Sequence, residues 1–155
     1  MRYLLKHVFL ALLFVLGLSS ASSAYQNVET SDIYVVMFRA DWCAPCKIVE
    51  PRLEDVIATL QDPKIEYINI DISAGNGAWN ANTVFDKEIV SQYNMWMGIT
   101  GFAAIIDADT KETLGCVNMT YNRDAMKRHL SNLQKLAQKN QSNFDITCPQ
   151  PNNPV

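Results

Sequence analysis

The chain has 155 residues, with 13 Lys and Arg against 16 Asp and Glu and a formal net charge of −3. This length is enough for one domain with a modest hydrophobic core. A mildly acidic chain without a basic cluster is a poor candidate for binding nucleic acid or an anionic membrane surface, so we expect neither as a partner.

The first 24 residues have the order of a secretory signal peptide. Basic residues near the start precede an apolar run at 8–18, and small residues continue to Ala24. The run is shorter than the roughly 20 residues that span a bilayer. We therefore expect cleavage after Ala24 or Ala21 and a periplasmic or secreted protein, with an uncleaved N-terminal anchor as the alternative. The mature chain keeps one histidine, His129, which disfavours Ser-His-Asp catalysis and most zinc sites.

Hydrophobic periodicity and turn residues predict the elements that follow. In chain order they are strand 33–40, helix 44–60, strand 65–72, loop 73–82, helix 83–93, strand 101–107, strand 112–119 and helix 122–139. Thr83 is expected to cap the second helix, with Phe85 and Ile89 on its inward face. Strands and helices thus follow the order β-α-β-α-β-β-α.

This order predicts an α/β fold. The first two strands are joined through a helix, so they are expected to be parallel with a right-handed crossover, and the last two form a hairpin. The result is a mixed four-stranded sheet with helices on both faces, within residues 25–139. Residues 1–24 form the predicted signal peptide, and the polar, proline-rich segment 140–155 is predicted to be a flexible tail.

The most informative motif is WCAPCK at 42–47, between the first strand and the first helix. Cys43 is expected at the helix N-cap, where unpaired N–H groups and the helix dipole favour a thiolate and lower the thiol pKa below about 8.5. Cys46, one turn inside, is expected to be less accessible. Cys43 is therefore the predicted nucleophile, Cys46 the resolving thiol, and Trp42 an apolar rim that contacts the substrate.

Two other readings of the cysteine pair stay open. A zinc site needs about four ligands, and a structural disulfide gains most from a long loop, so the pair fits neither well. Met95 and Met97 offer soft sulfur ligands for a copper-handling site with the pair, although they also suit a substrate-binding lip or core packing. A non-catalytic assembly or chaperone module is a further alternative. The redox reading requires no cofactor and no metal.

The segment FRADWCAPCKIVEP, residues 38–51, resembles the active-site segment of the thioredoxin superfamily. The shorter pattern ADWC-x-x-CK-x-x-E is similar to the C-terminal periplasmic domain of DsbD. The resemblance implies a thioredoxin fold and a monomeric thiol–disulfide oxidoreductase. It would exchange disulfides with exported protein substrates and with a redox partner protein.

The chain departs from the superfamily pattern at the acid beside the cysteines. Met37 stands where thioredoxins carry a buried acid. Glu50 matches a glutamate of the DsbD domain and follows Cys46 by one helical turn, so it can lie near that sulfur. Glu50 is therefore the predicted proton acceptor during resolution, with a solvated helix residue as the alternative.

The second departure is Gly101, which follows Thr100 where the superfamily has a cis-proline facing the CxxC motif. Both residues are predicted to contact the substrate backbone. Glycine keeps a close approach open but lacks the rigidity of proline. The family proline also discourages metal capture, so its absence favours the metal alternative somewhat. Because no histidine lies between the cysteines to stabilise the Cys43 thiolate, we predict a reductant.

Cys116 and Cys148 are the two remaining cysteines. They are candidates for a structural disulfide that ties the tail to the sheet. An electron relay from the CxxC pair, pairing between chains and inert thiols are the alternatives, and sequence does not choose among them.

Overall fold

A computed structural model describes residues 30–75, 77–144 and 147–151. The predicted signal peptide lies outside this range. Across the described residues, no helix combines the length and the hydrophobicity needed to cross a membrane.

The centre of the fold is a four-stranded sheet in the order β2-β1-β3-β4. Its strands are β1 (Ile33–Arg39), β2 (Ile65–Asp71), β3 (Phe102–Asp107) and β4 (Thr113–Asn118). β1 is parallel to β2 and antiparallel to β3, and β3 and β4 form an antiparallel pair. The predicted mixed α/β sheet is confirmed.

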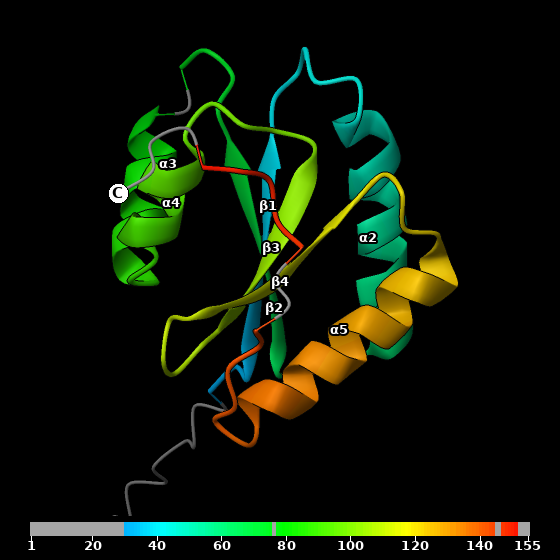
Figure 1. Ribbon diagram of the computed structural model, residues 1–155. Helices are drawn as coiled ribbons and strands as arrows, with labels where there is room; N and C mark the ends of the chain where they lie inside the picture. Colours follow the sequence, from blue (N-terminus) through cyan, green and yellow to red (C-terminus); the bar gives the residue numbers. More distant parts are fainter. Residues whose placement is uncertain (1–29, 76, 145–146, 152–155) are drawn as a thin grey trace, which may run out of the picture.

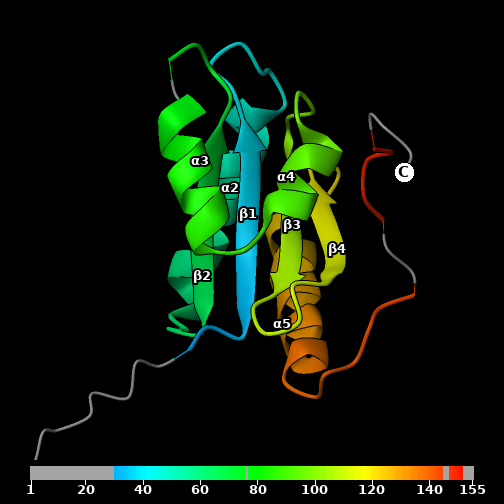
Figure 2. The same cartoon turned by 90° about the vertical axis from the view of Figure 1, so that its left-hand side faces the viewer.

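Helices cover both faces of this sheet, as predicted (Figure 1). One face carries α2 (Cys46–Leu60) and α5 (Arg123–Ala137), and the other carries α3 (Gly77–Asp86) and α4 (Val90–Trp96). Figure 2 shows α3 and α4 side by side in front of the strands. α5 begins after Asn122, whose side chain accepts a hydrogen bond from the Ala125 amide and so caps the helix.

The prediction for residues 73–93 is wrong in detail. The predicted loop 73–82 becomes helical from Gly77, so Thr83 lies inside α3 and its hydroxyl donates to the Trp79 carbonyl instead of capping a helix. The chain then turns at Glu88, which has φ of 57°, and α4 follows as a separate helix. Because of this break, Phe85 points outward and is 67% exposed.

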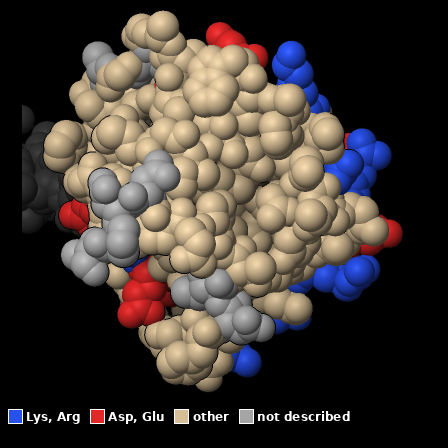
Figure 3. All heavy atoms as spheres, turned by 45° about the horizontal axis from the view of Figure 1, so that its top comes forward, with Lys and Arg blue, Asp and Glu red and all other residues tan. Residues whose placement is uncertain are grey.

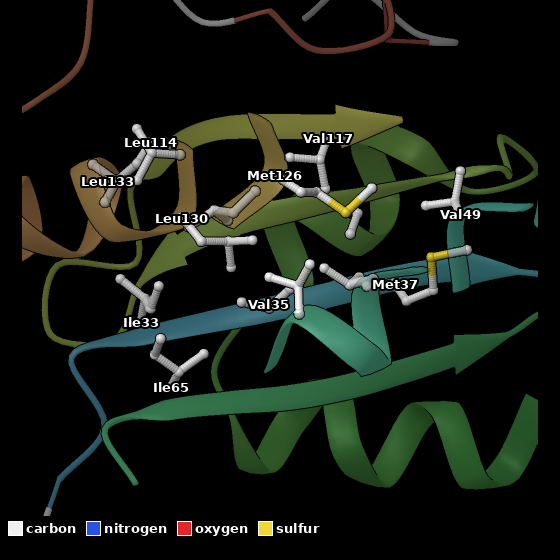
Figure 4. Packing of buried hydrophobic residues seen from close by; sticks show 14 of the residues in the cluster. Ile33, Val35, Met37, Val49, Ile65, Leu114, Val117, Met126, Leu130 and Leu133 are labelled. Carbon is white, nitrogen blue, oxygen red and sulfur yellow. The ribbon is translucent and has the colours of Figure 1, made fainter. Parts of the chain in front are cut away.

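β1 separates two hydrophobic clusters. Ile33, Val35 and Met37 pack against α2 and α5, and Figure 4 shows this cluster from close by. Val36 and Phe38, on the alternate positions, pack against α3 and α4 on the other face. A strand buried on both faces needs a continuous apolar run, which is why 33–38 lacks polar alternation.

The described parts of the C-terminal segment are attached to the sheet rather than loose, in contrast to the predicted flexible tail. The contacts are Ser142 Oγ to Glu112 Oε2 (2.7 Å), Asn143 Nδ2 to the Leu114 carbonyl (2.7 Å), Trp96 Nε1 to the Pro149 carbonyl (3.1 Å) and the Cys116–Cys148 disulfide. The contacts with Leu114 and Cys116 lie on β4, an edge strand whose outer side would otherwise be open to pairing.

Candidate redox site

Cys43 and Cys46 form a disulfide just beyond the carboxyl end of β1. The helix starts later than predicted: α2 begins at Cys46, with Pro45 rather than Cys43 at the N-cap. Even so, the Cys46 amide donates to the Cys43 sulfur at 3.1 Å. The first amide of the helix therefore points at the predicted nucleophile, which is the contact that stabilises a thiolate there.

The two sulfurs do not differ in exposure as predicted. Cys43 is 3% exposed and Cys46 is 2% exposed, so both residues are buried. Cys46 Sγ also lies 3.8 Å from the Phe38 carbonyl. Trp42, by contrast, is 68% exposed and extends into solvent beside the pair. A partner must therefore react with a cysteine of which very little is exposed in the disulfide form.

Gly101 lies directly opposite the pair. A Cβ added to it would lie 2.8 Å from Pro45 Cβ and 3.6 Å from Cys43 Sγ. Gly101 also has φ of 90°, a left-handed conformation that side chains disfavour, and its amide donates to the Phe38 carbonyl at 3.0 Å. A proline fits neither this φ nor this hydrogen bond, so the backbone here is built around glycine. Thr100, the other predicted contact, is half-buried next to it.

Glu50 lies in a polar network and is not simply solvated. Asn69 Nδ2 donates to Glu50 Oε1 at 2.8 Å, and Arg39 Nε donates to Glu50 Oε2 at 3.1 Å. Asn69 is also the cross-strand partner of Met37 in the β1–β2 register. The Glu50 carboxylate thus reaches from α2 to the residue beside Met37, the position at which thioredoxins carry their acid.

Arg39 gathers three carboxylates at the end of β1. It forms ion pairs with Asp41, Glu50 and Asp71. Burial alone would lower the pKa of Arg39, but the charges of Glu50 and Asp71 outweigh this effect and raise it. Three carboxylates share the one guanidinium of Arg39, and a carboxylate that lies near a thiol disfavours its thiolate form.

Sequence reasoning missed the polar residues of β2 that face α2. The Tyr67 hydroxyl and Asn69 Oδ1 are buried and have no hydrogen-bond partner among the described residues. Burial, with the charges of Glu50 and Glu54 added to it, raises the pKa of Tyr67. The signal was the alternation in β2, where Tyr67, Asn69 and Asp71 share one face and Ile68 and Ile70 lie on the other.

The second disulfide joins Cys116 of β4 to Cys148. Both of these cysteines pack in the cluster on the α3–α4 face, whereas Cys43 and Cys46 belong to the cluster on the α2–α5 face. The sheet lies between the two disulfides, which argues against a direct electron relay. All four cysteines are paired within the chain, so none is left for pairing between chains.

Met95 and Met97, the methionines considered for a copper site, lie in different surroundings. Within the described residues, no three His, Cys, Asp or Glu side chains are grouped as metal ligands. Met95 packs against the α3–α4 cluster, Trp96 is 2% exposed within it, and Met97 is 50% exposed. Of the three residues in the Met95–Met97 segment, Met97 is therefore the most exposed to a partner.

The end of the molecule that carries the pair is poor in charge. Figure 3 turns the top of the Figure 1 view, where the β1–α2 turn lies, towards the reader. Uncharged residues occupy the middle of this face, and Lys, Arg, Asp and Glu lie mostly at its margin. A face of this kind suits contact with an uncharged polypeptide segment.

This sheet order, the helices on both faces and the disulfide at the start of α2 define a thioredoxin-fold domain with a CxxC pair. The thioredoxin family model matches residues 18–91, just under half of the chain. The predicted fold is confirmed.

Curated relatives match over the same short region. The chain is 37% identical over 51 residues to thioredoxin H8 of Arabidopsis thaliana, covering 33% of this chain and 33% of that protein. It is 53% identical over 46 residues to the mitochondrial thioredoxin of Bos taurus, covering 30% and 26%. It is 37% identical over 51 residues to the thioredoxin of Chlamydia pneumoniae, and the match covers 33% of this chain and 50% of that protein. The chain thus spans between about a quarter and a half of the length of these relatives.

Solved structures align over a longer region with lower identity. Oxidized mitochondrial thioredoxin 3 of Saccharomyces cerevisiae is 18% identical and covers 66% of this chain and 79% of its own, with a TM-score of 0.40. The reduced thioredoxin pre-protein of Schistosoma mansoni is 18% identical, also with a TM-score of 0.40. The alignment covers 69% of this chain and 81% of that protein.

Proposed function

We propose that this protein is a thiol–disulfide oxidoreductase that acts on protein disulfides through Cys43 and Cys46. The observation that carries the proposal is the Cys43–Cys46 disulfide with the first amide of α2 directed at the Cys43 sulfur. A helix N-terminus lowers the cost of a thiolate at that sulfur, and the thiolate is the species that attacks a disulfide.

The reaction needs only the two cysteines and a substrate disulfide. The Cys43 thiolate attacks one sulfur of the substrate, breaks the substrate S–S bond and releases one substrate thiolate. Cys46 then loses its proton and attacks Cys43 Sγ, which releases the second substrate thiolate and forms the Cys43–Cys46 disulfide. Glu50 is the proposed acceptor of the Cys46 proton, because it lies one helical turn away and is held in place by Asn69 and Arg39.

We further propose that the protein acts as a monomeric reductant. The carboxylates gathered by Arg39 disfavour thiolates at this end of the sheet, so they favour the disulfide form of the protein over its dithiol form. A protein whose disulfide form is favoured gives electrons to its partners. The N-terminal pattern supports a periplasmic or secreted location, with exported proteins as substrates and a redox partner protein as electron donor.

The test is reduction of insulin by the purified mature chain with dithiothreitol as electron donor. We expect turnover that is lost in Cys43→Ser, and a trapped mixed disulfide with substrate in Cys46→Ser. Turnover that is unaffected by Cys43→Ser would contradict the proposal. Copper that co-purifies at one equivalent and is lost in Cys43→Ser would instead support the metal-handling alternative.

The direction is tested by the reduction potential of the Cys43–Cys46 pair. A value near about −270 mV is expected for a reductant, whereas a value near about −120 mV is typical of an oxidant. A clearly oxidising value would reverse the proposed direction and leave the exchange chemistry standing.

A further inference from the structure

The segment that faces the CxxC pair is attached at its start to the C-terminal segment. Trp96, the last residue of α4, donates its Nε1–H to the Pro149 carbonyl at 3.1 Å. The neighbouring residue, Cys148, is bonded to Cys116 of β4. One short stretch of the tail thus connects the end of α4 to the edge strand of the sheet.

Trp96 and Gly101 are ends of the same short connection. The Ile99 amide donates to the Trp96 carbonyl at 2.9 Å, and the Gly101 amide donates to the Phe38 carbonyl at 3.0 Å. Only four residues therefore separate Trp96, which contacts the tail, from Gly101, which lies opposite Cys43. Because the connection is short, a displacement of Trp96 should also displace the backbone of Gly101.

The far end of the connection is tied to the same aromatic cluster. Phe102 follows Gly101 and stacks on Phe38, with ring centroids 5.1 Å apart, and its ring lies 5.4 Å from Trp96 in an edge-on arrangement. Cys116 packs in this cluster and pairs with Ala104 in the β3–β4 register. The second disulfide and the two ends of the 97–101 connection thus share one set of packing contacts.

We propose that Trp96 and Cys148 are positioning residues for the exchange reaction. Their contacts hold the 97–101 connection so that Gly101 stays against Pro45 and Cys43. The proposal rests on the proposed oxidoreductase function for its kinetic consequence, but its structural consequence, the order of the Gly101 backbone, does not depend on activity.

We call the Trp96–Pro149 hydrogen bond and the Cys116–Cys148 disulfide together the lock. Two variants each remove one part of it. Trp96→Phe keeps an aromatic ring in the cluster but removes the Nε1–H donor together with part of the buried indole ring. Cys116→Ala/Cys148→Ala removes the covalent tie. Ser142→Ala is the matched control, because it removes a tail hydrogen bond to Glu112 near the β3–β4 turn and leaves both the disulfide and the Trp96 contact in place.

The first measurement is amide hydrogen exchange at Gly101, compared with Leu130 in the core of α5 on the other face. We expect exchange at Gly101 to become about tenfold faster relative to Leu130 in Trp96→Phe and in the double variant, with no change in Ser142→Ala. If the disulfide only stabilised the whole fold, its removal would raise the exchange rates of both amides by the same factor. Equal changes at Gly101 and Leu130 would overturn the proposal, whether or not the protein reduces insulin.

The second measurement is the rate constant for mixed-disulfide formation by Cys43. Misplacement of groups in a reacting site by an ångström can cost up to about a hundredfold, so a several-fold to tenfold loss is expected in both lock variants. The reduction potential should stay at the wild-type value, because the lock contacts neither sulfur. Rates equal to wild type in both variants would remove the catalytic part of the proposal. A wild type without any exchange activity would instead refute the proposed function.

Discussion

At the scale of single residues, the site is defined by close contacts that leave little room. Gly101 approaches Pro45 and Cys43 more closely than any residue with a side chain can. Glu50 has both carboxylate oxygens engaged, by Asn69 and by Arg39. Each contact predicts a distinct effect of substitution.

Gly101→Ala should lower the free energy of unfolding by about 2–4 kcal/mol, because it adds left-handed backbone strain and a clash with Pro45. Gly75→Ala is the matched control, since Gly75 has φ of 94° but nothing within 4 Å of an added Cβ. That variant should lose about 1 kcal/mol from strain alone. Urea unfolding of both variants measures the difference, and equal losses would show that the contact with Pro45 is unimportant.

Glu50→Gln should slow resolution of the mixed disulfide by about 10²-fold, the lower end of the range for general base catalysis. The attack of Cys43 on substrate should be nearly unchanged. Rapid acid quenching of the mixed disulfide separates these two steps. Glu54→Gln, on the exposed side of the same helix, is the control. A normal resolution rate in Glu50→Gln would remove Glu50 from the mechanism.

His129 should make stability depend on pH. Its Nε2 is buried without a hydrogen-bond partner among the described residues, and burial lowers the pKa of its imidazole. The unfolded chain therefore binds a proton at a higher pH, about 6.5, than the folded chain does. Stability should fall as the pH drops below that value. Thermal unfolding of wild type and His129→Leu between pH 5 and about 7.5 checks this, because the variant should lack this part of the slope.

At the scale of elements, β4 and the C-terminal segment depend on each other. The sheet leaves β4 at an edge, and side-chain contacts and one disulfide cover it. The Cys116–Cys148 bond closes a loop with a sequence separation of 32, whereas Cys43 and Cys46 are separated by 3. In the chain-entropy view, the longer loop stabilises the fold more.

Cys116→Ala/Cys148→Ala should therefore lower the free energy of unfolding by about 3 kcal/mol, chiefly because the unfolded chain regains freedom. Urea unfolding under non-reducing conditions measures the loss. Ser142→Ala should change stability by no more than about 1 kcal/mol, the net value of one hydrogen bond. A double variant as stable as wild type would mean that the disulfide is strained or that the unfolded chain stays compact.

At the scale of the whole molecule, the arrangement of charge bears on the direction of electron flow. The face around the CxxC pair is largely uncharged (Figure 3), while carboxylates outnumber the guanidinium at the adjacent end of β1. Thiolates are therefore less favoured in the folded state than a helix N-terminus alone would make them.

For a reductant, the Cys43–Cys46 disulfide form should be more stable than the dithiol form, by about 1–2 kcal/mol if loop closure alone contributes. Unfolding of the Cys116→Ala/Cys148→Ala protein with and without reductant isolates this pair. A dithiol form that is the more stable one is the behaviour of a strong oxidant and would contradict the proposed direction.

Most of the fold could be predicted from local pattern. The apolar run of β1, the spacing of apolar residues in α2 and α5 and the hairpin of β3 and β4 each appear within a short window of sequence. The start of α3 could not, because Gly77 and the Asn residues after it have low helix propensity, which tertiary packing on the sheet overrides. The break between α3 and α4 could not either, because it occurs at Glu88, where no glycine or proline marks a turn.

The sequence by itself determined the chemistry available to this protein: two cysteines at a strand-to-helix turn and a glycine just before β3. Only the tertiary structure decided the partners of these residues, namely Asn69 for Glu50, Pro45 for Gly101 and the tail for Trp96. The physical reason is that local periodicity specifies which face of an element is apolar. The contacts across that face depend on strand register and on packing between segments that lie far apart in the chain.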